Sequence, residues 1–176
     1  MEVEKAALLC PVSHSGEVFM IERSFFNEKL NIPERFPGEW TFAGGHYSPG
    51  DKDLIATAER EFREETGYEE GIHSQKLMFE SKPVLYGKQY LIHFYSAALE
   101  FTEGPFRPHS GEVVDLRWFF PKDAIALITS DTFEAGLLNW YSRYDLGNEK
   151  YGPHKVTSRK FPHQTLNALE FLLNGK

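Results

Sequence analysis

The sequence predicts a single domain of the α/β class, and three observations favour this class. Segments rich in β-branched and aromatic residues, typical of strands, share the chain with segments whose apolar residues recur every three or four positions, as in helices. The length of 176 residues suits one domain. No repeat, low-complexity tract or linker divides the sequence. We therefore expect one domain over residues 1–176, with an irregular and helical C-terminal extension from about residue 129.

The composition excludes several classes of protein. Hydrophobic residues make up 41% of the chain and charged residues 26%, and the mean hydropathy is −0.44, as in soluble globular proteins. No apolar run approaches the roughly 20 residues that span a bilayer, so we expect no membrane partner. The net charge of −7 argues against non-specific binding of nucleic acid. The first five residues, MEVEK, carry acids where a signal peptide is basic, and this favours a cytoplasmic location.

The first two expected elements are strands. Residues 5–13 and 17–23 are apolar stretches separated by residues 14–16 (HSG), which is typical of a hairpin with a short turn. The single cysteine, Cys10, lies in the first stretch. One cysteine can form neither an internal disulfide nor a zinc site built from several cysteines. We interpret Cys10 as a small buried apolar residue.

A loop, a short extended segment and a helix are expected next. Prolines and glycines in residues 24–40 predict a loop that ends in an extended segment at 39–43. Residues 44–51 (GGHYSPGD) predict a turn. From residue 52 to residue 66 the apolar positions have helical spacing, and Gly67 is a typical helix end. The apolar face of this helix consists of Leu54, Ile55, Ala58 and Phe62.

The remaining elements follow from the same two patterns. Three more strands are expected at residues 73–80, 90–101 and 113–120. Three helices are expected at residues 121–128, 132–144 and 163–173, the first opened by a proline. Residues 145–161 predict a long irregular segment.

Acidic residues of the helix at 52–66 are the first candidates for a functional site. Glu61, Glu64 and Glu65 stand at positions i, i+3 and i+4, so their carboxylates project from one side of the helix. Such a run alone is typical of a solvated face with ion pairs. The Gly-Gly turn upstream can expose carbonyl oxygens to the same cation, and Mg²⁺ prefers oxygen ligands. Asp51 follows near the helix start, where its charge suits the helix dipole. Together these features favour a site for a divalent cation.

The same segment resembles the sequence box of the Nudix hydrolases, written G-x5-E-x7-R-E-U-x-E-E-x-G-U, where U is aliphatic or aromatic. The chain reads Gly45-x5-Asp51-x8-Arg60-Glu61-Phe62-x-Glu64-Glu65-x-Gly67-Tyr68. The second half matches at every fixed position. In the first half Asp51 replaces the usual Glu, and one extra residue precedes Arg60. Boxes lengthened in this way are similar to those of the coenzyme A diphosphatase branch.

The resemblance implies a fold and an activity. The fold would be an α/β/α sandwich with a mixed sheet, in which the box forms a loop-helix-loop. The activity would be hydrolysis of a nucleoside diphosphate linked to another moiety, with Mg²⁺ or Mn²⁺ as cofactor. Glu61, Glu64 and Glu65 would bind the metal together with the carbonyl oxygen of Gly45. Arg60 would orient a neighbouring carboxylate.

Two residues outside the box complete the candidate site. Members of the family take the proton of the attacking water on a box glutamate or on an acid of a later loop. Glu112, in a glycine-containing turn before the strand at 113–120, is a candidate metal ligand or base, with Glu103 as a weaker rival. Arg23, at the end of the second strand, suits a contact with a substrate phosphate.

Three hypotheses of function follow. The first is a metal-dependent diphosphatase acting on a small nucleotide derivative: a nucleotide sugar, ADP-ribose, coenzyme A, a dinucleotide or a nucleoside triphosphate. The second is an enzyme similar to isopentenyl-diphosphate isomerase, but Gly44 stands where such an enzyme needs a cysteine. The third is a non-catalytic nucleotide-binding protein, which would normally have lost some of the three carboxylates. The length of the chain allows a homodimer.

Overall fold

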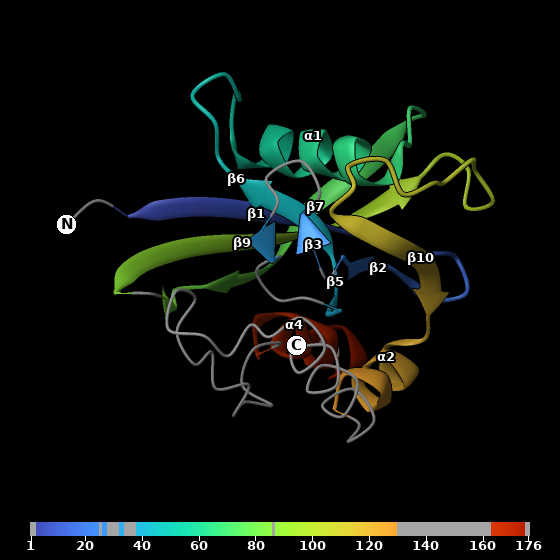
Figure 1. Cartoon of the computed structure of the whole chain (residues 1–176). Helices are drawn as coiled ribbons and strands as arrows, with labels where there is room; N and C mark the ends of the chain where they lie inside the picture. Colours follow the sequence, from blue (N-terminus) through green and yellow to red (C-terminus); the bar gives the residue numbers. More distant parts are fainter. Residues whose placement is uncertain are drawn as a thin grey trace.

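A layer of two β-sheets lies between one helix on one side and two helices on the other (Figure 1). The computed structural model describes residues 3–24, 26–27, 32–33, 38–85, 87–129 and 163–174. The strands are β1 (Glu4–Pro11), β2 (Val18–Arg23), β3 (Phe26–Asn27), β4 (Ile32–Pro33), β5 (Trp40–Thr41), β6 (Ala43–His46), β7 (Ile72–Ser81), β8 (Val84–Leu85), β9 (Lys88–Leu99) and β10 (Val113–Phe119). The helices are α1 (Leu54–Thr66), α2 (Pro121–Ile128) and α4 (His163–Asn174). The helix expected at 132–144 and the irregular segment at 145–161 lie outside the described residues.

The layer consists of two larger sheets that differ in strand direction, and β3 and β4 form a separate antiparallel pair. The larger sheet has the order β6-β1-β9-β7, with β8 added along β9. In it β1 pairs in parallel with β9 and antiparallel with β6, so the sheet is mixed. The smaller sheet, in the order β10-β2-β5, is antiparallel. Helix α1 covers one side of this layer, and α2 and α4 pack together on the other (Figure 1). The expected α/β/α sandwich is confirmed.

The prediction that the first two strands form a hairpin is confirmed for the turn but is wrong for the strands, which do not pair along their length. The N–H of Ser13 donates to the carbonyl of Glu17, and Val12 and Val18 form a single bridge. After this bridge the strands separate into different sheets. Both edges of β1 are already paired, with β6 on one side and β9 on the other, so β1 has no edge left for β2.

The Gly-Gly turn expected at residues 44–51 is also wrong, because these glycines lie in strand β6. Gly44 and Gly45 pair with Leu8 and Ala7 of β1. A Cβ atom on Gly44 would lie 2.3 Å from the carbonyl oxygen of Ala7, so only glycine fits this close approach. The turn begins later, where the N–H of Asp51 donates to the carbonyl of Ser48.

Helix α1 begins and ends close to the expected positions. Its N-cap is Asp53, whose side chain accepts a hydrogen bond from the N–H of Ala56. It ends at Gly67, which has a φ of 65° and whose N–H donates to the carbonyl of Arg63. Helices α2 and α4 and strands β7, β9 and β10 confirm the elements expected near these positions, whereas β8 was not expected. The short strands β3 and β4, which pair with each other, lie where residues 24–40 were expected to form a loop.

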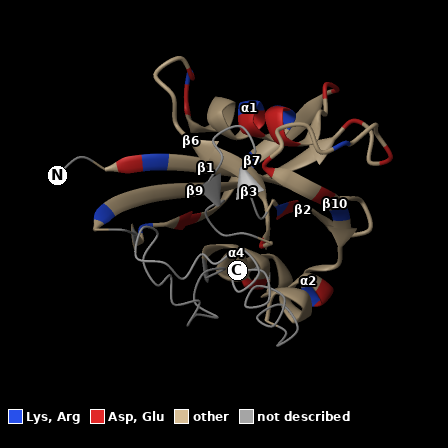
Figure 2. Cartoon of the chain, in the orientation of Figure 1, with Lys and Arg blue, Asp and Glu red and all other residues tan. Residues whose placement is uncertain are grey.

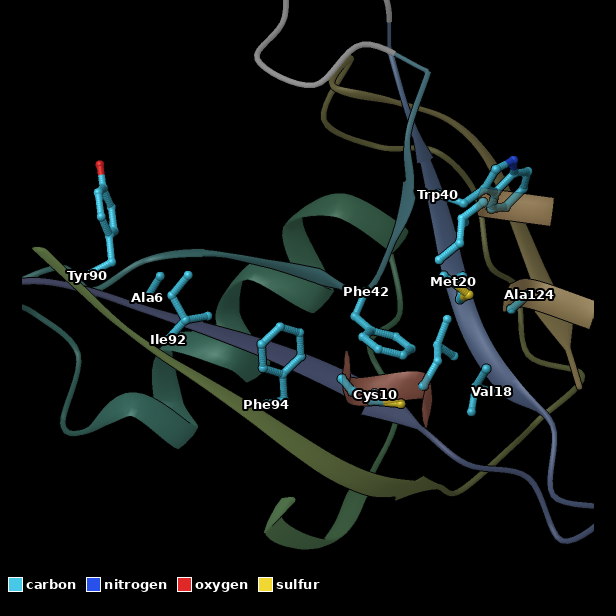
Figure 3. Packing of buried hydrophobic residues seen from close by; sticks show 13 residues of the cluster. Ala6, Cys10, Val18, Met20, Trp40, Phe42, Tyr90, Ile92, Phe94 and Ala124 are labelled. Atoms are coloured by element: carbon cyan, nitrogen blue, oxygen red, sulfur yellow. The ribbon is translucent and has the colours of Figure 1, made fainter. Parts of the chain in front are cut away.

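The apolar core has two parts, one on each side of the sheets. Phe62 of α1 packs against Phe19 and Tyr68 in the first part, with ring centroids 5.8 Å apart in each pair. In the second part Cys10 and Phe42 pack beneath α2 and α4 (Figure 3). Cys10 is fully buried, which confirms the interpretation of its role. No helix in the described part of the chain is long and apolar enough to cross a membrane.

Candidate active site

The candidate site lies where helix α1 packs against strand β6. A Cβ atom on Gly45 would lie 2.5 Å from the carboxyl carbon of Glu61. The carboxylate of Glu61 therefore rests directly against the backbone of Gly45, and a side chain at this position would displace it. Two of the predicted metal donors, one from a helix and one from a strand, are brought together in this way.

Glu65, one helical turn later, is the most enclosed acid of the box. Its side chain is 4% exposed, and its Oε2 accepts a hydrogen bond of 2.9 Å from the N–H of Gly44. Burial raises the pKa of Glu65 to about 8, and the charges of Glu61 and Glu112 act in the same direction. The positive charge of Arg23 and the hydrogen bond from Gly44 oppose this rise. The fold thus encloses a carboxyl group whose ionised form is stabilised by a nearby cation.

The other two acids of the box have different surroundings. Glu61 is 18% exposed and Glu64 is 57% exposed. Burial also raises the pKa of Glu61, while the hydrogen bond and charge of Arg60 oppose the rise. Glu61 and Glu65 turn toward β6, whereas Glu64 lies at the outer rim. Figure 2 shows acidic and basic residues side by side along α1.

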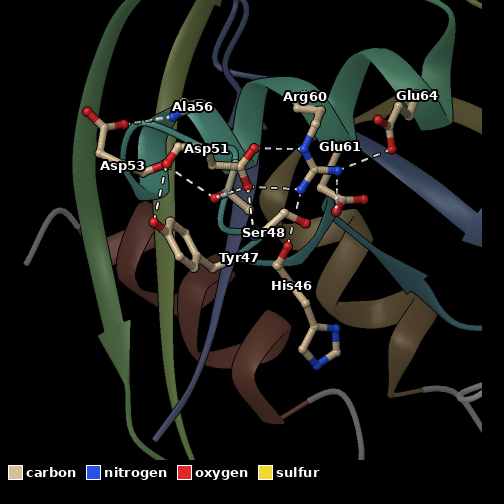
Figure 4. Close-up of polar contacts among 10 residues, drawn as sticks. His46, Tyr47, Ser48, Asp51, Asp53, Ala56, Arg60, Glu61 and Glu64 are labelled. Atoms are coloured by element: carbon tan, nitrogen blue, oxygen red, sulfur yellow. Dashed lines mark hydrogen bonds and ion pairs between the residues drawn. The ribbon is translucent and has the colours of Figure 1, made fainter.

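Arg60 is fixed by a network of acceptors (Figure 4). Its Nε and Nη2 donate to the two carboxylate oxygens of Asp51 over 2.9 and 3.0 Å, which is a bidentate pair. Its Nη1 donates to Glu61 over 2.8 Å and to Glu64 over 3.3 Å, and Nη2 also donates to the carbonyl of His46. These contacts suit a residue that orients Glu61.

Asp51 lies near the start of α1 but does not cap the helix. Its Oδ2 accepts a hydrogen bond of 2.9 Å from the Ser48 N–H (Figure 4). The same oxygen accepts a hydrogen bond of 2.8 Å from the Thr57 hydroxyl. The hydrogen bond from Arg60 holds the pKa of Asp51 well below its usual range. Asp51 therefore stays ionised and anchors Arg60, and Asp53 takes the capping position.

Glu112 reaches the site from the loop before β10. Its carbonyl oxygen accepts a hydrogen bond of 2.7 Å from the N–H of Ser24, at the end of β2. The same loop contacts α1, because the N–H of His109 donates to the carbonyl of Glu65. The side chain of Glu112 is 43% exposed, and its charge raises the pKa of both Glu61 and Glu65. The structure thus brings Glu112 to the carboxylates of the box.

Arg23 also lies among these carboxylates. Its Nη1 is 3.9 Å from Oε1 of Glu65, and its Nη2 is 3.8 Å from Oε2 of Glu112. Its backbone N–H donates to the carbonyl of Glu39 over 2.8 Å. The end of β2 is therefore part of the same site as α1 and the loop before β10.

Glu39 is a residue that the sequence analysis did not single out. It is buried, and burial raises the pKa of its carboxyl to about 8, against the opposing charge of Arg23. The signal was present in the sequence: an acid stands directly before the apolar segment Trp40–Thr41, in a stretch expected to be extended. A carboxylate in such a place is rarely solvated, which makes it a candidate for a functional residue.

The donor atoms of this site suit a hard divalent cation. They are carboxylate and carbonyl oxygens, and the charge of Glu112 lies close enough to raise the pKa of both Glu61 and Glu65. As the described side chains stand, no three His, Cys, Asp or Glu residues among them are arranged to hold an ion. Arginines instead contact the acids, Arg60 at Glu61 and Arg23 at Glu65. Binding an ion here therefore requires that carboxylates turn from an arginine to the metal.

A model of the NUDIX domain matches residues 4–141. The chain is a member of the Nudix hydrolase family. The Nudix helix is α1, and the resemblance seen in the sequence is confirmed. Placement in the coenzyme A diphosphatase branch stays a prediction.

Solved structures share this Nudix fold. A MutT protein from Methanosarcina mazei Go1 has a TM-score of 0.56 and 18% identity, covering 85% of this chain and 99% of that one. A C. elegans Ap4A hydrolase in a binary complex has a TM-score of 0.55 and 21% identity, covering 83% and 100%. The NUDIX domain of Shewanella oneidensis NrtR, complexed with ADP ribose, has a TM-score of 0.50 and 19% identity, covering 70% and 75%. None of the curated proteins compared matches the chain.

Proposed function

We propose that this Nudix hydrolase cleaves the diphosphate linkage of a nucleoside diphosphate joined to another moiety, with Mg²⁺ as its cofactor and Mn²⁺ as a substitute. One observation carries the proposal. Glu61 and Glu65 of α1 converge on the Gly44–Gly45 backbone of β6, and Glu112 faces them from a second element. An oxygen-rich cluster with excess negative charge suits a cation that also binds phosphates.

Each residue of the site has a proposed role. Glu61, Glu65 and the carbonyl of Gly45 hold the metal, and Glu64 binds at the rim. When bound, the cation neutralises charge on the diphosphate and lowers the pKa of the attacking water. Arg60, anchored by Asp51, keeps the carboxylate of Glu61 turned toward β6.

Glu112 is the proposed acceptor of the water's proton. A general base has to reach both the water and the solvent into which the proton is finally released. Glu112 is 43% exposed, whereas Glu65 is almost fully enclosed. Glu112 also lies on a loop held by hydrogen bonds at both α1 and β2, which fixes its position relative to the metal ligands.

The substrate class is proposed from the same site and from the related structures. Ap4A and ADP ribose, named with two of these structures, both contain an adenosine linked through phosphates. Arg23 faces the carboxylates that would hold the metal, so it lies near the phosphates of such a substrate. We propose a small nucleotide-derived substrate of this kind, acted on in the cytoplasm.

The decisive experiment is product analysis in ¹⁸O-labelled water. The purified protein is incubated with Mg²⁺ and a panel of nucleotide sugars, ADP-ribose, coenzyme A, dinucleoside polyphosphates and nucleoside triphosphates. Mass spectrometry then identifies the products and the labelled phosphorus. Cleavage of a diphosphate, abolished by a metal chelator, is the expected result. Binding without cleavage would instead indicate a non-catalytic nucleotide-binding protein, and an isomerised isopentenyl diphosphate an isomerase.

A further inference from the structure

The guanidinium of Arg23 bridges two carboxylates that come from different elements. Glu65 belongs to α1, and Glu112 belongs to the loop before β10. The nitrogen-oxygen distances of 3.9 and 3.8 Å are those of ion pairs rather than of hydrogen bonds. The side chains of Arg23 and Glu65 are only 16% and 4% exposed, so water screens the attraction between them little, whereas water screens Glu112, which is 43% exposed, more strongly.

The backbone of Arg23 is held firmly at this position. Its N–H donates to the carbonyl of Glu39 over 2.8 Å, and its carbonyl accepts from the N–H of Gly38 over 3.0 Å. The next residue, Ser24, donates to the carbonyl of Glu112 over 2.7 Å. The guanidinium can therefore move only by rotation of its own side chain, while its attachment point stays beside the site.

The two arginines of the site differ in how tightly they are held to their acids. Arg60 makes hydrogen bonds of 2.9 and 3.0 Å to Asp51, which is a bidentate pair that fixes the guanidinium. Arg23 faces Glu65 and Glu112 at the longer distances given above. A divalent cation bound to Glu65 and Glu112 would compete with the Arg23 guanidinium for the same two carboxylates.

We propose that Arg23 is the built-in counter-ion of the metal site. While no divalent cation is bound, it offsets the negative charge of Glu65 and Glu112 in their ionised forms, and it gives way when the cation arrives. The proposal rests on the proposed function, because it takes Glu65 as a metal ligand. Arg23 acts through the two carboxylates and is therefore a positioning residue, which sets how tightly the protein binds its metal.

The size of the effect follows from elementary electrostatics. A unit charge about 4 Å from a carboxylate changes a binding equilibrium by about fivefold or more, depending on how much water screens it. To bind, the metal has to overcome part of the attraction between Arg23 and the carboxylates of Glu65 and Glu112. Removal of the positive charge should therefore tighten metal binding about tenfold, which is equivalent to about 1.4 kcal/mol.

The test measures metal affinity directly and without substrate. Mn²⁺ is titrated into the full chain, and bound and free ion are separated by electron paramagnetic resonance. We expect Arg23→Gln to lower the Kd for Mn²⁺ about tenfold and Arg23→Lys to stay within about twofold of the wild type. Arg117→Gln is the matched control, because it removes the same charge from an exposed ion pair with Asp115. Arg23→Met replaces Arg23→Gln if circular dichroism shows that the latter does not fold.

The outcomes separate this proposal from the proposed function. An unchanged or higher Kd in Arg23→Gln overturns the counter-ion proposal, and so does a higher KM with an unchanged metal Kd, which indicates a substrate contact alone. If Glu65→Gln loses Mn²⁺ binding in the same series, the proposed metal site still stands. If Glu65→Gln binds Mn²⁺ as the wild type does, the metal site itself is wrong and both proposals fall.

Discussion

Glu61, Glu64 and Glu65 belong to one sequence motif, yet the fold gives each a different environment. Their side chains are 18%, 57% and 4% exposed. The spacing in the sequence places all three on one side of α1, but it does not say how deep the neighbouring strand lies. Because β6 carries glycines there, the first and last of the three reach its backbone. The acids of the motif should therefore contribute unequally to turnover.

Glu65→Gln tests the most enclosed of these acids. We expect kcat to fall by about a hundredfold or more, because the change removes a proposed ligand charge. Stability should not fall, since a neutral amide replaces a buried carboxyl group whose ionisation is unfavourable. Steady-state kinetics and urea unfolding measure the two effects. Unchanged turnover, or a collapsed fold in circular dichroism, would contradict the assignment.

Glu112→Gln tests the proposed base. Loss of the proton acceptor should lower kcat by about a hundredfold, with little change in fold stability, because the side chain is partly exposed. Glu103→Gln is the matched control, since Glu103 is an exposed acid of the preceding turn and was the rival candidate. Wild-type kinetics of Glu112→Gln across the pH range would remove Glu112 from the site.

Glu39 makes stability depend on pH. Burial raises the pKa of its carboxyl to about 8 in the folded protein, above the ordinary value of 4.5. The stability it contributes is therefore present at acidic pH and is lost as the pH rises through about 8, by at most about 1.4 kcal/mol per pH unit. Glu39→Gln removes this dependence. Urea unfolding in the presence of a chelator measures the free energy of unfolding at each pH. The value for Glu39→Gln should rise relative to that of the wild type as the pH rises, and an unchanged difference between the two proteins would contradict the prediction.

The sequence predicts the acids of the site better than their partners. Regular spacing within one helix identifies Glu61, Glu64 and Glu65, because neighbours on a helix are close in sequence. The contact of Arg23 with Glu65 depends on how β2 lies beside α1, and no local pattern encodes that. Glu39 stands directly before Trp40 in a stretch expected to be extended, which is a local signal, but its burial results from packing between elements far apart in the chain.

At the scale of elements, strand β6 is the feature that allows the acids of α1 to contact the Gly44–Gly45 backbone. Gly45→Ala places a methyl group where the Glu61 carboxylate lies, at 2.5 Å from its carbon. A carboxylate at the end of a flexible side chain can move away, so we expect the fold to survive and kcat to fall at least about tenfold. Gly50→Ala, where no atom lies within 4 Å of the added carbon, is the control. Equal activity of the two variants would show that Glu61 need not touch β6.

The elements themselves were predicted well where local chemistry determines them. Asp53 and Gly67 mark the ends of α1 by capping, and Pro121 opens α2 at the predicted position. The two errors concern pairing. Gly44 was interpreted as part of a turn because glycine is common in turns, whereas here it allows two strands to approach closely. The turn at 14–16 exists, but which strand pairs with β1 is decided by strands far away in sequence.

For the whole molecule, α4 ties the second helical layer to the sheet that carries the site. The hydroxyls of Thr41, in β5, and Thr165, in α4, form a buried hydrogen bond of 2.9 Å. Thr165→Val should lower the free energy of unfolding by about 1 to 2 kcal/mol, because the Thr41 hydroxyl is left buried without this partner. Urea unfolding measures the change, with Asn167→Ala at an exposed position of α4 as control. A loss no larger than that of the control would contradict the role of this bond.

The place of β1 in the larger sheet also determines when the sheet can be completed during synthesis. Glu4–Pro11 leaves the ribosome well before its parallel partner β9, which follows only at Lys88–Leu99. At about 5 to 20 residues per second, the ribosome needs several seconds to supply that partner. Until then one edge of an apolar strand stays open to other chains. The nascent protein therefore passes through a period in which β1 has to be shielded, and folding of the larger sheet ends late.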